Sequence, residues 1–425
     1  MSDFLALLRS NRNYRYTWLA QVVSEAGDYF NNIAVFSLAL ETTGSGLVVS
    51  GVMLARAIPA VAAGPVAGVA LDRFDRRRIM IATDLIRAAV AAAFVLAVGR
   101  PRPGLLFALC ALLMFASPFF SSGRAAILPS IATPGELHTA NSLTQTTQWA
   151  TLTVGTLAAG YATAWLGYRG AFLFNALSFL FSAWAIAKLR LPRGGFQPRR
   201  EAQARGGSLR PWAEYRDGLR YMRSVPLILG IAMISVGWAT GGGAAQILFA
   251  LFGEQVFHRG PAGIGTIWGM AGVGLLLGGA LGHWIGRRTG FSGYKRTISA
   301  AYISHGLTYV LFSQMENYAA ALAMILLSRV GMAVSSVLNQ YQLLRHTPDE
   351  FRGRVFSTLE SLRWAVMIGS MAAAGIASQY FSPRAIGLVA GVLSSLTAVW
   401  WTWADSTGRL PEPPERQPAD AGADG

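Results

Sequence analysis

Cysteine and charged side chains are scarce in this chain of 425 residues. The single cysteine, Cys110, lies within an apolar segment, which excludes an intramolecular disulfide framework and a metal site built from cysteines. Charged residues make up 13% of the sequence and hydrophobic residues 53%, and the mean hydropathy is +0.39. Soluble domains carry about 25% charged residues, so the composition indicates a protein of the lipid bilayer.

Motifs of enzymes are also absent from the sequence. It has no nucleotide-binding loop, no cluster of metal ligands and no nucleophile elbow, so we expect neither enzyme activity nor a bound cofactor or metal. The formal charge of +15 does not indicate nucleic-acid binding, because the basic residues lie between apolar segments and not in a domain of their own. Cytoplasmic loops and anionic lipid headgroups account for the excess better.

Long apolar segments occupy most of the chain. About twelve of them reach the roughly 20 residues that cross the hydrocarbon core, so the sequence predicts an all-α membrane protein with twelve transmembrane helices in two six-helix halves. The segments lie near residues 15–40, 47–71, 79–98, 105–127, 140–165, 170–189, 226–251, 263–285, 297–313, 318–340, 355–379 and 384–403.

The regions between and after these segments define the expected domains. We expect an N-terminal half (1–189), a cytoplasmic linker with an interfacial helix (190–225), a C-terminal half (226–404) and a disordered cytoplasmic tail (405–425). Loops predicted to lie inside carry more arginine and lysine than those predicted outside. The positive-inside rule and the even number of helices therefore place both termini in the cytoplasm of a bacterial cell, with the protein in the inner membrane.

The two halves are related in sequence. A shift of 214 residues aligns the TPGEL segment at Thr133 with the TPDEF segment at Thr347. The same shift aligns Ala60, Gly64, Gly68 and Asp72 with Gly274, Gly278, Gly282 and Gly286. Two matches at one offset indicate a duplication of six helices, which in transporters places the substrate site between the halves near the membrane midplane.

A basic turn follows the second predicted helix. Gly64, Gly68 and Asp72 recur every four residues and share one helix face, where the missing side chains let a neighbouring helix approach closely. The basic residues of the turn include Arg73, Arg76 and Arg77. This pattern resembles the loop motif of the major facilitator superfamily, and Asp-Arg-Phe-Asp-Arg-Arg resembles the branch with the enterobactin exporter and macrolide efflux pumps. Asp75 stands where the superfamily usually has a second glycine.

The resemblance implies a gate on the cytoplasmic side. In the superfamily the motif aspartate lies near the N-terminus of the eleventh helix when that side is closed, where the helix dipole favours an anion. In this chain the aspartate is Asp72, and the helix begins near residues 353–356, with Arg352 and Arg354 beside it. The alternative is that the basic turn only sets topology.

Ionisable residues inside the predicted spans are costly and mark candidate functional sites. We expect at least one of Glu25, Asp28 and Arg56 to line the cavity, with Asp28 as the proton-coupling carboxylate. Asp84 and Arg87 lie three residues apart near the cytoplasmic face, so we assign them to a structural ion pair near the gate. The alternative for Asp28 is a buried pair with Arg56 that only joins two helices.

Arg124 and Arg329 also fall within predicted spans. Trp238 and Trp268 are candidates for aromatic walls around a ligand, whereas His305 has no partner that the sequence reveals.

Taken together, these features predict a secondary transporter that works by alternating access. The resemblance implies export of an amphipathic or siderophore-like small molecule in exchange for protons, by a monomer whose other partners are membrane lipids. One alternative is a lipid or lysophospholipid flippase of the same fold. The other is a non-transporting membrane scaffold, against which the intramembrane carboxylates argue.

Overall fold

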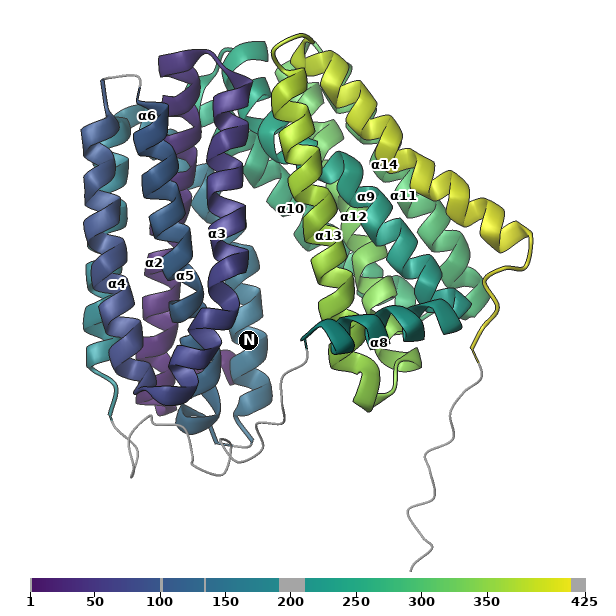
Figure 1. The fold of residues 1–425 in the computed structure, drawn as a ribbon, viewed down its shortest axis with the longest axis horizontal. Helices are drawn as coiled ribbons and strands as arrows, with labels where there is room; N and C mark the ends of the chain where they lie inside the picture. The colour runs from purple at the N-terminus through teal and green to yellow at the C-terminus, as the bar shows by residue number, and fades with distance from the viewer. Residues whose placement is uncertain (1, 100–101, 134, 191–210, 414–425) are drawn as a thin grey trace, which may run out of the picture.

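The computed structural model describes residues 2–99, 102–133, 135–190 and 211–413, and within these ranges all regular secondary structure is helical (Figure 1). The first half contains α1 (Ser2–Ser10), α2 (Arg12–Thr43), α3 (Gly46–Arg73), α4 (Arg76–Ala93), η1 (Phe94–Ala97), α5 (Pro103–Ile131) and α6 (Leu137–Ala187). After it come α8 (Pro211–Ser224), α9 (Pro226–Leu251), η2 (Phe252–Val256), α10 (Gly260–Gly286), α11 (Phe291–Gln314), α12 (Tyr318–His346), α13 (Asp349–Ala377) and α14 (Pro383–Ser406).

Helix α6 comprises two membrane-crossing arms. Gly167 interrupts it with φ 69° and ψ 172°, a conformation that glycine adopts without the steric cost that a side chain would impose. Eight helices of the described chain are long and apolar enough to cross a membrane, with α6 counted once. The more polar helices α2, α11 and α13 have 32, 24 and 29 residues. With these three and the second arm of α6, the prediction of twelve transmembrane helices in two halves is confirmed.

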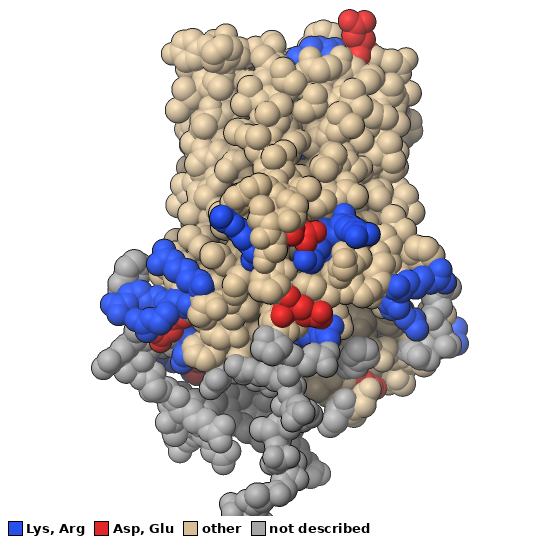
Figure 2. All heavy atoms as spheres, turned by 90° about the vertical axis from the view of Figure 1, so that its right-hand side faces the viewer, with Lys and Arg blue, Asp and Glu red and all other residues tan. Residues whose placement is uncertain are grey.

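Charged side chains leave a broad belt of the surface free. On the face shown in Figure 2, the surface is apolar or uncharged between a few charged side chains at the top and a larger group that begins at about mid-height, and most lysine, arginine, aspartate and glutamate residues gather toward the lower end. In Figure 1, helix α8 and the Phe74–Asp75 turn lie at this end. A belt of this kind matches the hydrocarbon core of a bilayer, so the chain is a multi-pass membrane protein.

The two copies of the repeated glycine face pack differently. A Cβ atom added to Gly278 of α10 would lie 2.3 Å from the carbonyl oxygen of Val330 in α12, and one on Gly274 would lie 2.4 Å from that of Leu326. Close packing of this face is therefore present in the second half. In the first half, a Cβ atom on Gly64 or Gly68 would meet no atom within 4 Å, so the expected close neighbour of these glycines is wrong for this conformation.

The halves contact each other toward the end opposite the Phe74–Asp75 turn. Ser50 of α3 donates a hydrogen bond to the carbonyl oxygen of Met371 in α13, at 2.8 Å. Gly160 of α6 faces Gly265 of α10 so closely that a Cβ atom would lie 2.8 Å from its Cα atom. Toward the turn, the ribbons of α3 and α13 diverge (Figure 1), and the glycine face of α3 is open. The protein is therefore open at the end predicted to face the cytoplasm.

The expected interfacial helix of the linker corresponds to α8. It packs on α13, where the rings of Tyr221 and Phe351 stack with centroids 4.8 Å apart. A Cβ atom on Gly218 would lie 2.5 Å from the Thr358 hydroxyl, so α8 is fixed to the C-terminal half. Residues 191–210 of the predicted linker lie outside the described residues.

The chain remains ordered beyond the start of the predicted disordered tail, so that prediction is wrong for residues 405–410. Asp405 forms an ion pair with Lys295 at 2.5 Å, and the Lys295 ammonium also donates to the carbonyl oxygen of Leu410 at 3.3 Å. Leu410 is buried against Gly230, because an apolar side chain shortly after α14 finds an apolar surface there. Residues 414–425 lie outside the described part of the tail.

The TPGEL segment forms a local hydrogen-bonded turn before α6. The Thr133 amide donates to Glu136 Oε2 at 2.9 Å, and Asn11 of the first half donates to the same oxygen at 3.1 Å. The backbone hydrogen bond from Thr133 lowers the pKa of the Glu136 carboxyl from its ordinary value. The Glu136 carboxylate therefore joins the turn before α6 to Asn11, which lies between α1 and α2.

Candidate functional site

An ion-pair cluster lies inside the N-terminal half. Arg87 of α4 is buried and donates from Nη2 to Asp28 Oδ2 of α2 at 2.8 Å, and from Nη1 to Asp84 Oδ1 at 3.1 Å. Its guanidinium group also lies 3.9 Å from the ring centroid of Phe179 in α6. One oxygen of each carboxylate is buried without a hydrogen-bond partner within the described chain. The cluster therefore contains two carboxylates that share one guanidinium.

This geometry corrects two features of the predicted site. The expected Asp84–Arg87 pair is present, but it does not form a separate set near the gate, because Arg87 also binds Asp28. The alternative pair between Asp28 and Arg56 does not form, since no ion pair of Arg56 occurs in the described structure. The long arginine side chain reaches from α4 to α2, and residue spacing within one helix does not reveal a partner on another.

Glu25 belongs to a second polar group in the same half. Its Oε1 atom accepts from Arg124 of α5 at 3.3 Å, and its Oε2 atom accepts from the Thr151 hydroxyl at 2.6 Å. Arg124 also lines a polar cavity of about 380 Å³ together with Gln21 and Gln148. Three helices, α2, α5 and α6, thus converge on this cavity, which the sequence did not reveal.

Two adjoining cavities lie where the halves meet. The first, of about 120 Å³, is lined by Tyr29, Asn32, Ile33, Phe36, Met53, Arg56, Leu152, Thr156, Gln246 and Trp268. The second, of about 90 Å³, is lined by Leu152, Trp238, Gly242, Gln246, Phe249, Trp268, Ala271, Gly272, Leu275, Arg329 and Met332. They share Leu152 of the N-terminal half with Gln246 and Trp268 of the C-terminal half. Arg56, predicted as a cavity residue, therefore lines the first cavity.

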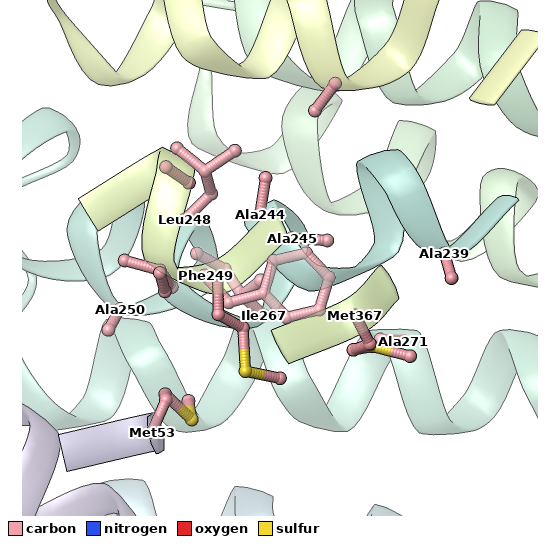
Figure 3. Close-up of a cluster of buried hydrophobic side chains, with 14 of the residues drawn as sticks. Met53, Ala239, Ala244, Ala245, Leu248, Phe249, Ala250, Ile267, Ala271 and Met367 are labelled. Carbon is pink, nitrogen blue, oxygen red and sulfur yellow. The ribbon is translucent and has the colours of Figure 1, made fainter. Parts of the chain in front are cut away.

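Apolar side chains form much of the surroundings of these cavities. Figure 3 shows Met53, from the N-terminal half, beside the cluster that Phe249, Ile267 and Ala271 form on α9 and α10. The central site thus offers apolar surface from both halves and two arginines, one from each half.

In the C-terminal half, Trp238, His305 and Ser328 form a buried hydrogen-bonded group. Trp238 Nε1 donates to His305 Nε2 at 3.1 Å, and Ser328 Oγ lies 2.8 Å from His305 Nδ1. The partners of His305 could not be seen in the sequence, because these contacts join the three helices α9, α11 and α12. Arg329 lies over the rings of Phe249 and Tyr309, at 5.1 and 5.9 Å.

The predicted gate residues on the first half do not contact α13 here. Asp72 and Arg73 are exposed, and Asp72 has no ion pair among the described residues. Arg76 donates to the carbonyl oxygen of Ala126 at 2.9 Å. Arg77 donates to carbonyl oxygens at the end of α6, including that of Ile186 at 3.2 Å. These arginines thus bind carbonyl groups near helix C-termini, where a cation is favoured.

On the C-terminal half, the predicted gate residues Arg352 and Arg354 also bind groups other than Asp72. Arg352 donates to the carbonyl oxygen of Leu344 at 3.2 Å, near the end of α12. Arg354 Nη1 lies 4.0 Å from Asp217 Oδ2 of α8. The structure therefore does not bring Asp72 together with Arg352 or Arg354, because the protein is open at this end.

A polar contact that the sequence did not predict joins the halves at the other end. The Ser37 hydroxyl of α2 donates to Glu254 Oε2 at 2.9 Å and lies 3.1 Å from the Tyr168 hydroxyl, which in turn donates to Glu41. Glu254 lies in the π-helical turn η2, and such turns are frequent at functional sites. This group, Ser37, Glu41, Tyr168 and Glu254, is called the outer seal below. The only signal in the sequence was an acidic residue near the end of an apolar segment.

Comparison with known proteins identifies the family. The family model described as Major Facilitator Superfamily matches residues 17–365. The putative bacilysin exporter BacE of Bacillus amyloliquefaciens is 24% identical over 360 residues, which cover 84% of this chain and 87% of that protein. The multidrug efflux pump Tap of Mycolicibacterium fortuitum is 27% identical over 395 residues, covering 88% and 93%.

A solved structure shares the fold. The crystal structure of a bacterial homologue of the iron transporter ferroportin in an inward-facing state has a TM-score of 0.68 and 18% identity to this chain. It covers 92% of this chain, and this chain covers 98% of it. At this identity the likeness concerns the fold alone.

Proposed function

Since the chain belongs to the Major Facilitator Superfamily of transporters, we propose that it exports a small amphipathic molecule across the bacterial inner membrane in exchange for protons. The printed names of two relatives, a putative exporter and an efflux pump, favour export over import. The observation that carries proton coupling is the cluster in which Asp28 and Asp84 share Arg87.

The charge of this cluster makes it suited to bind and release a proton. Two carboxylates and one guanidinium carry a net charge of −1, and one bound proton neutralises it. Asp84 has no exposed surface, whereas Asp28 is 24% exposed, so Asp28 is the member that water reaches. A charge inside the membrane is costly. The charged cluster therefore favours a conformation in which water or a cation reaches it, whereas the neutral, protonated cluster has no such requirement.

Closure of the cytoplasmic side links this cluster to α3. The open glycine face with Gly64, Gly68 and Asp72 is the surface that closure would cover, with Asp72 near the N-terminus of α13. Movement of α3 also carries Arg56, a cation that lines the cavity between α3 and α2, the helix of Asp28. Arg56 then competes with Arg87 for the Asp28 carboxylate, so proton release is coupled to closure.

Opening on the other side requires the outer seal to separate. The hydrogen bond from Ser37 to Glu254 joins the two halves, as does the bond from Gln255 to the carbonyl oxygen of Gly44 at 2.9 Å. The free energy lost with these two hydrogen bonds is offset when α3 and Asp72 contact the start of α13 on the cytoplasmic side. The protein then exchanges between two states, as alternating access requires. The protein acts as a monomer with both termini in the cytoplasm.

Everted membrane vesicles test the proposal. With an acidic interior generated by respiration, a transported compound should dissipate the pH gradient, measured by recovery of a quenched pH-sensitive dye during a screen of amphipathic compounds. Asp28→Asn should abolish this recovery at equal membrane abundance. Glu316→Gln, which alters an exposed carboxylate between α11 and α12, is the matched control and should behave like the parent.

Two results would reject this function. If transport by the parent leaves the pH gradient unchanged, protons are not the coupling ion. If Asp28→Asn retains full recovery, Asp28 has no part in coupling.

A further inference from the structure

Arg329 is a buried cation without an acidic partner. It is 7% exposed, and no carboxylate within the described residues lies within 4.0 Å of its guanidinium. Its contacts are the rings of Phe249 and Tyr309 and the sulfur of Met332, 3.2 Å from Nη1. An arginine in the membrane interior is costly when no anion compensates it, so these contacts leave its charge unbalanced.

Arg56 is the arginine that the N-terminal half contributes to the central cavities. It lines the first central cavity, and its Nη1 atom is buried without a hydrogen-bond partner in the described structure. Asp28, on the neighbouring helix α2, is bound by Arg87 at 2.8 Å. The side of Arg56 that faces the cavity is therefore available to a ligand.

Trp268 connects the two arginines. It lines both central cavities, and its Nε1 atom is buried without a hydrogen-bond partner among the described residues. Arginine side chains and the indole nitrogen only donate hydrogen bonds. Three donors from two halves thus line two adjoining cavities, and the chemistry that satisfies them is an acceptor with negative charge.

We propose that the central site binds substrates in which an anionic group, a carboxylate or a phosphate-like group, is attached to an apolar body. Arg56 and Arg329 bind the anion from opposite halves, and Trp268 supplies a third donor. Guanidinium groups form charge-assisted hydrogen bonds with such anions, while Met53 and Phe249 contact the apolar body. The inference rests on the proposed transport function and names the substrate class of the same site.

An anion held by both arginines also has a consequence for movement. The arginines belong to different halves, so a bound anion attracts both halves toward each other. A ligand shifts a conformational equilibrium only through such differential contacts. Substrate binding therefore favours closure of the open cytoplasmic side.

Equilibrium binding to purified protein in detergent tests the substrate class. The probes share one dansyl group and differ in charge: dansylglycine carries a carboxylate, dansyl-aminomethylphosphonate a phosphonate, dansylamide no charge and dansylcadaverine an amine. Enhancement of dansyl fluorescence reports binding. We expect at least one anionic probe to bind about tenfold or more tightly than dansylamide and dansylcadaverine, and the two anions distinguish a carboxylate site from a phosphate site.

Variants connect this preference to the two arginines. Arg56→Gln and Arg329→Gln should each weaken binding of the anionic probe about tenfold or more, with dansylamide binding changed less than about twofold. Arg329→Lys, which keeps the charge, should restore part of the preference. Arg78→Gln, at an exposed position in the first turn of α4, is the matched control and should leave all four affinities unchanged.

Two outcomes overturn the inference. One is that neither anionic probe binds more tightly than dansylamide to the parent. The other is that folded Arg329→Gln and Arg56→Gln proteins retain the parent's preference. The assay uses no proton gradient, so it can fail while proton-driven export in vesicles succeeds, and the two proposals are tested separately.

Discussion

Removal of the Arg87 guanidinium tests the charge cluster of the N-terminal half. Arg87→Gln leaves Asp84, which has no exposed surface, beside Asp28 with no cation between them. Breaking a buried ion pair by removing one partner costs about 3 to 5 kcal/mol. The loss of contact between the guanidinium and the ring of Phe179, at 3.9 Å, adds about 0.5 to 2 kcal/mol. We expect destabilisation of about 3.5 to 7 kcal/mol.

Reversible unfolding in mixed micelles, by titration with SDS and followed by tryptophan fluorescence, measures this change. Adding Asp84→Asn to the Arg87→Gln variant should recover at least about half of the lost stability, because the uncompensated buried charge is then removed. Arg78→Gln, on the exposed surface, should unfold like the parent. The reasoning is refuted if Arg87→Gln is as stable as the parent, or if the second substitution recovers nothing.

Three further predictions concern the two ends of the molecule. Gly64→Leu should preserve stability and abolish transport, because the face of Gly64 is open here but covered on closure. Gly278→Leu should instead destabilise the protein by about 1 to 3 kcal/mol, because the larger side chain overpacks against α12. Equal stabilities of the two variants in SDS titration would contradict this. Ser37→Ala should weaken the outer seal, and Leu40→Cys, at a buried position one turn away on α2, should react faster with a membrane-impermeant maleimide in that background than in the parent background; equal rates would exclude a sealing role. A cysteine at Asp75 should be protected from the same maleimide in intact cells, and rapid labelling would reverse the orientation.

Composition and periodicity were sufficient to predict the membrane class, the twelve helices and the two halves. Crossing a bilayer requires about 20 apolar residues per helix with all backbone hydrogen bonds satisfied locally. A contiguous run of residues meets this requirement by itself, so it can be recognised in the sequence. The loop motif at Gly68 and Asp72 likewise indicated the family, since it is a local pattern. A helix in the linker was also predicted and is present as α8, because its periodicity is local.

The partners of the charged residues depended on tertiary structure. Asp28 pairs with Arg87, 59 positions away, and not with Arg56, because ion pairing between helices depends on how the helices are placed and rotated against each other. Whether the glycine face at Gly64 is open or covered depends on the conformation of the whole molecule. One sequence must be compatible with both the open and the closed conformation, so it does not tell which of them is seen. Only the folded structure shows that no described carboxylate lies near Arg329. Any helix of the bundle could have supplied one, and the sequence does not say which helices surround this side chain.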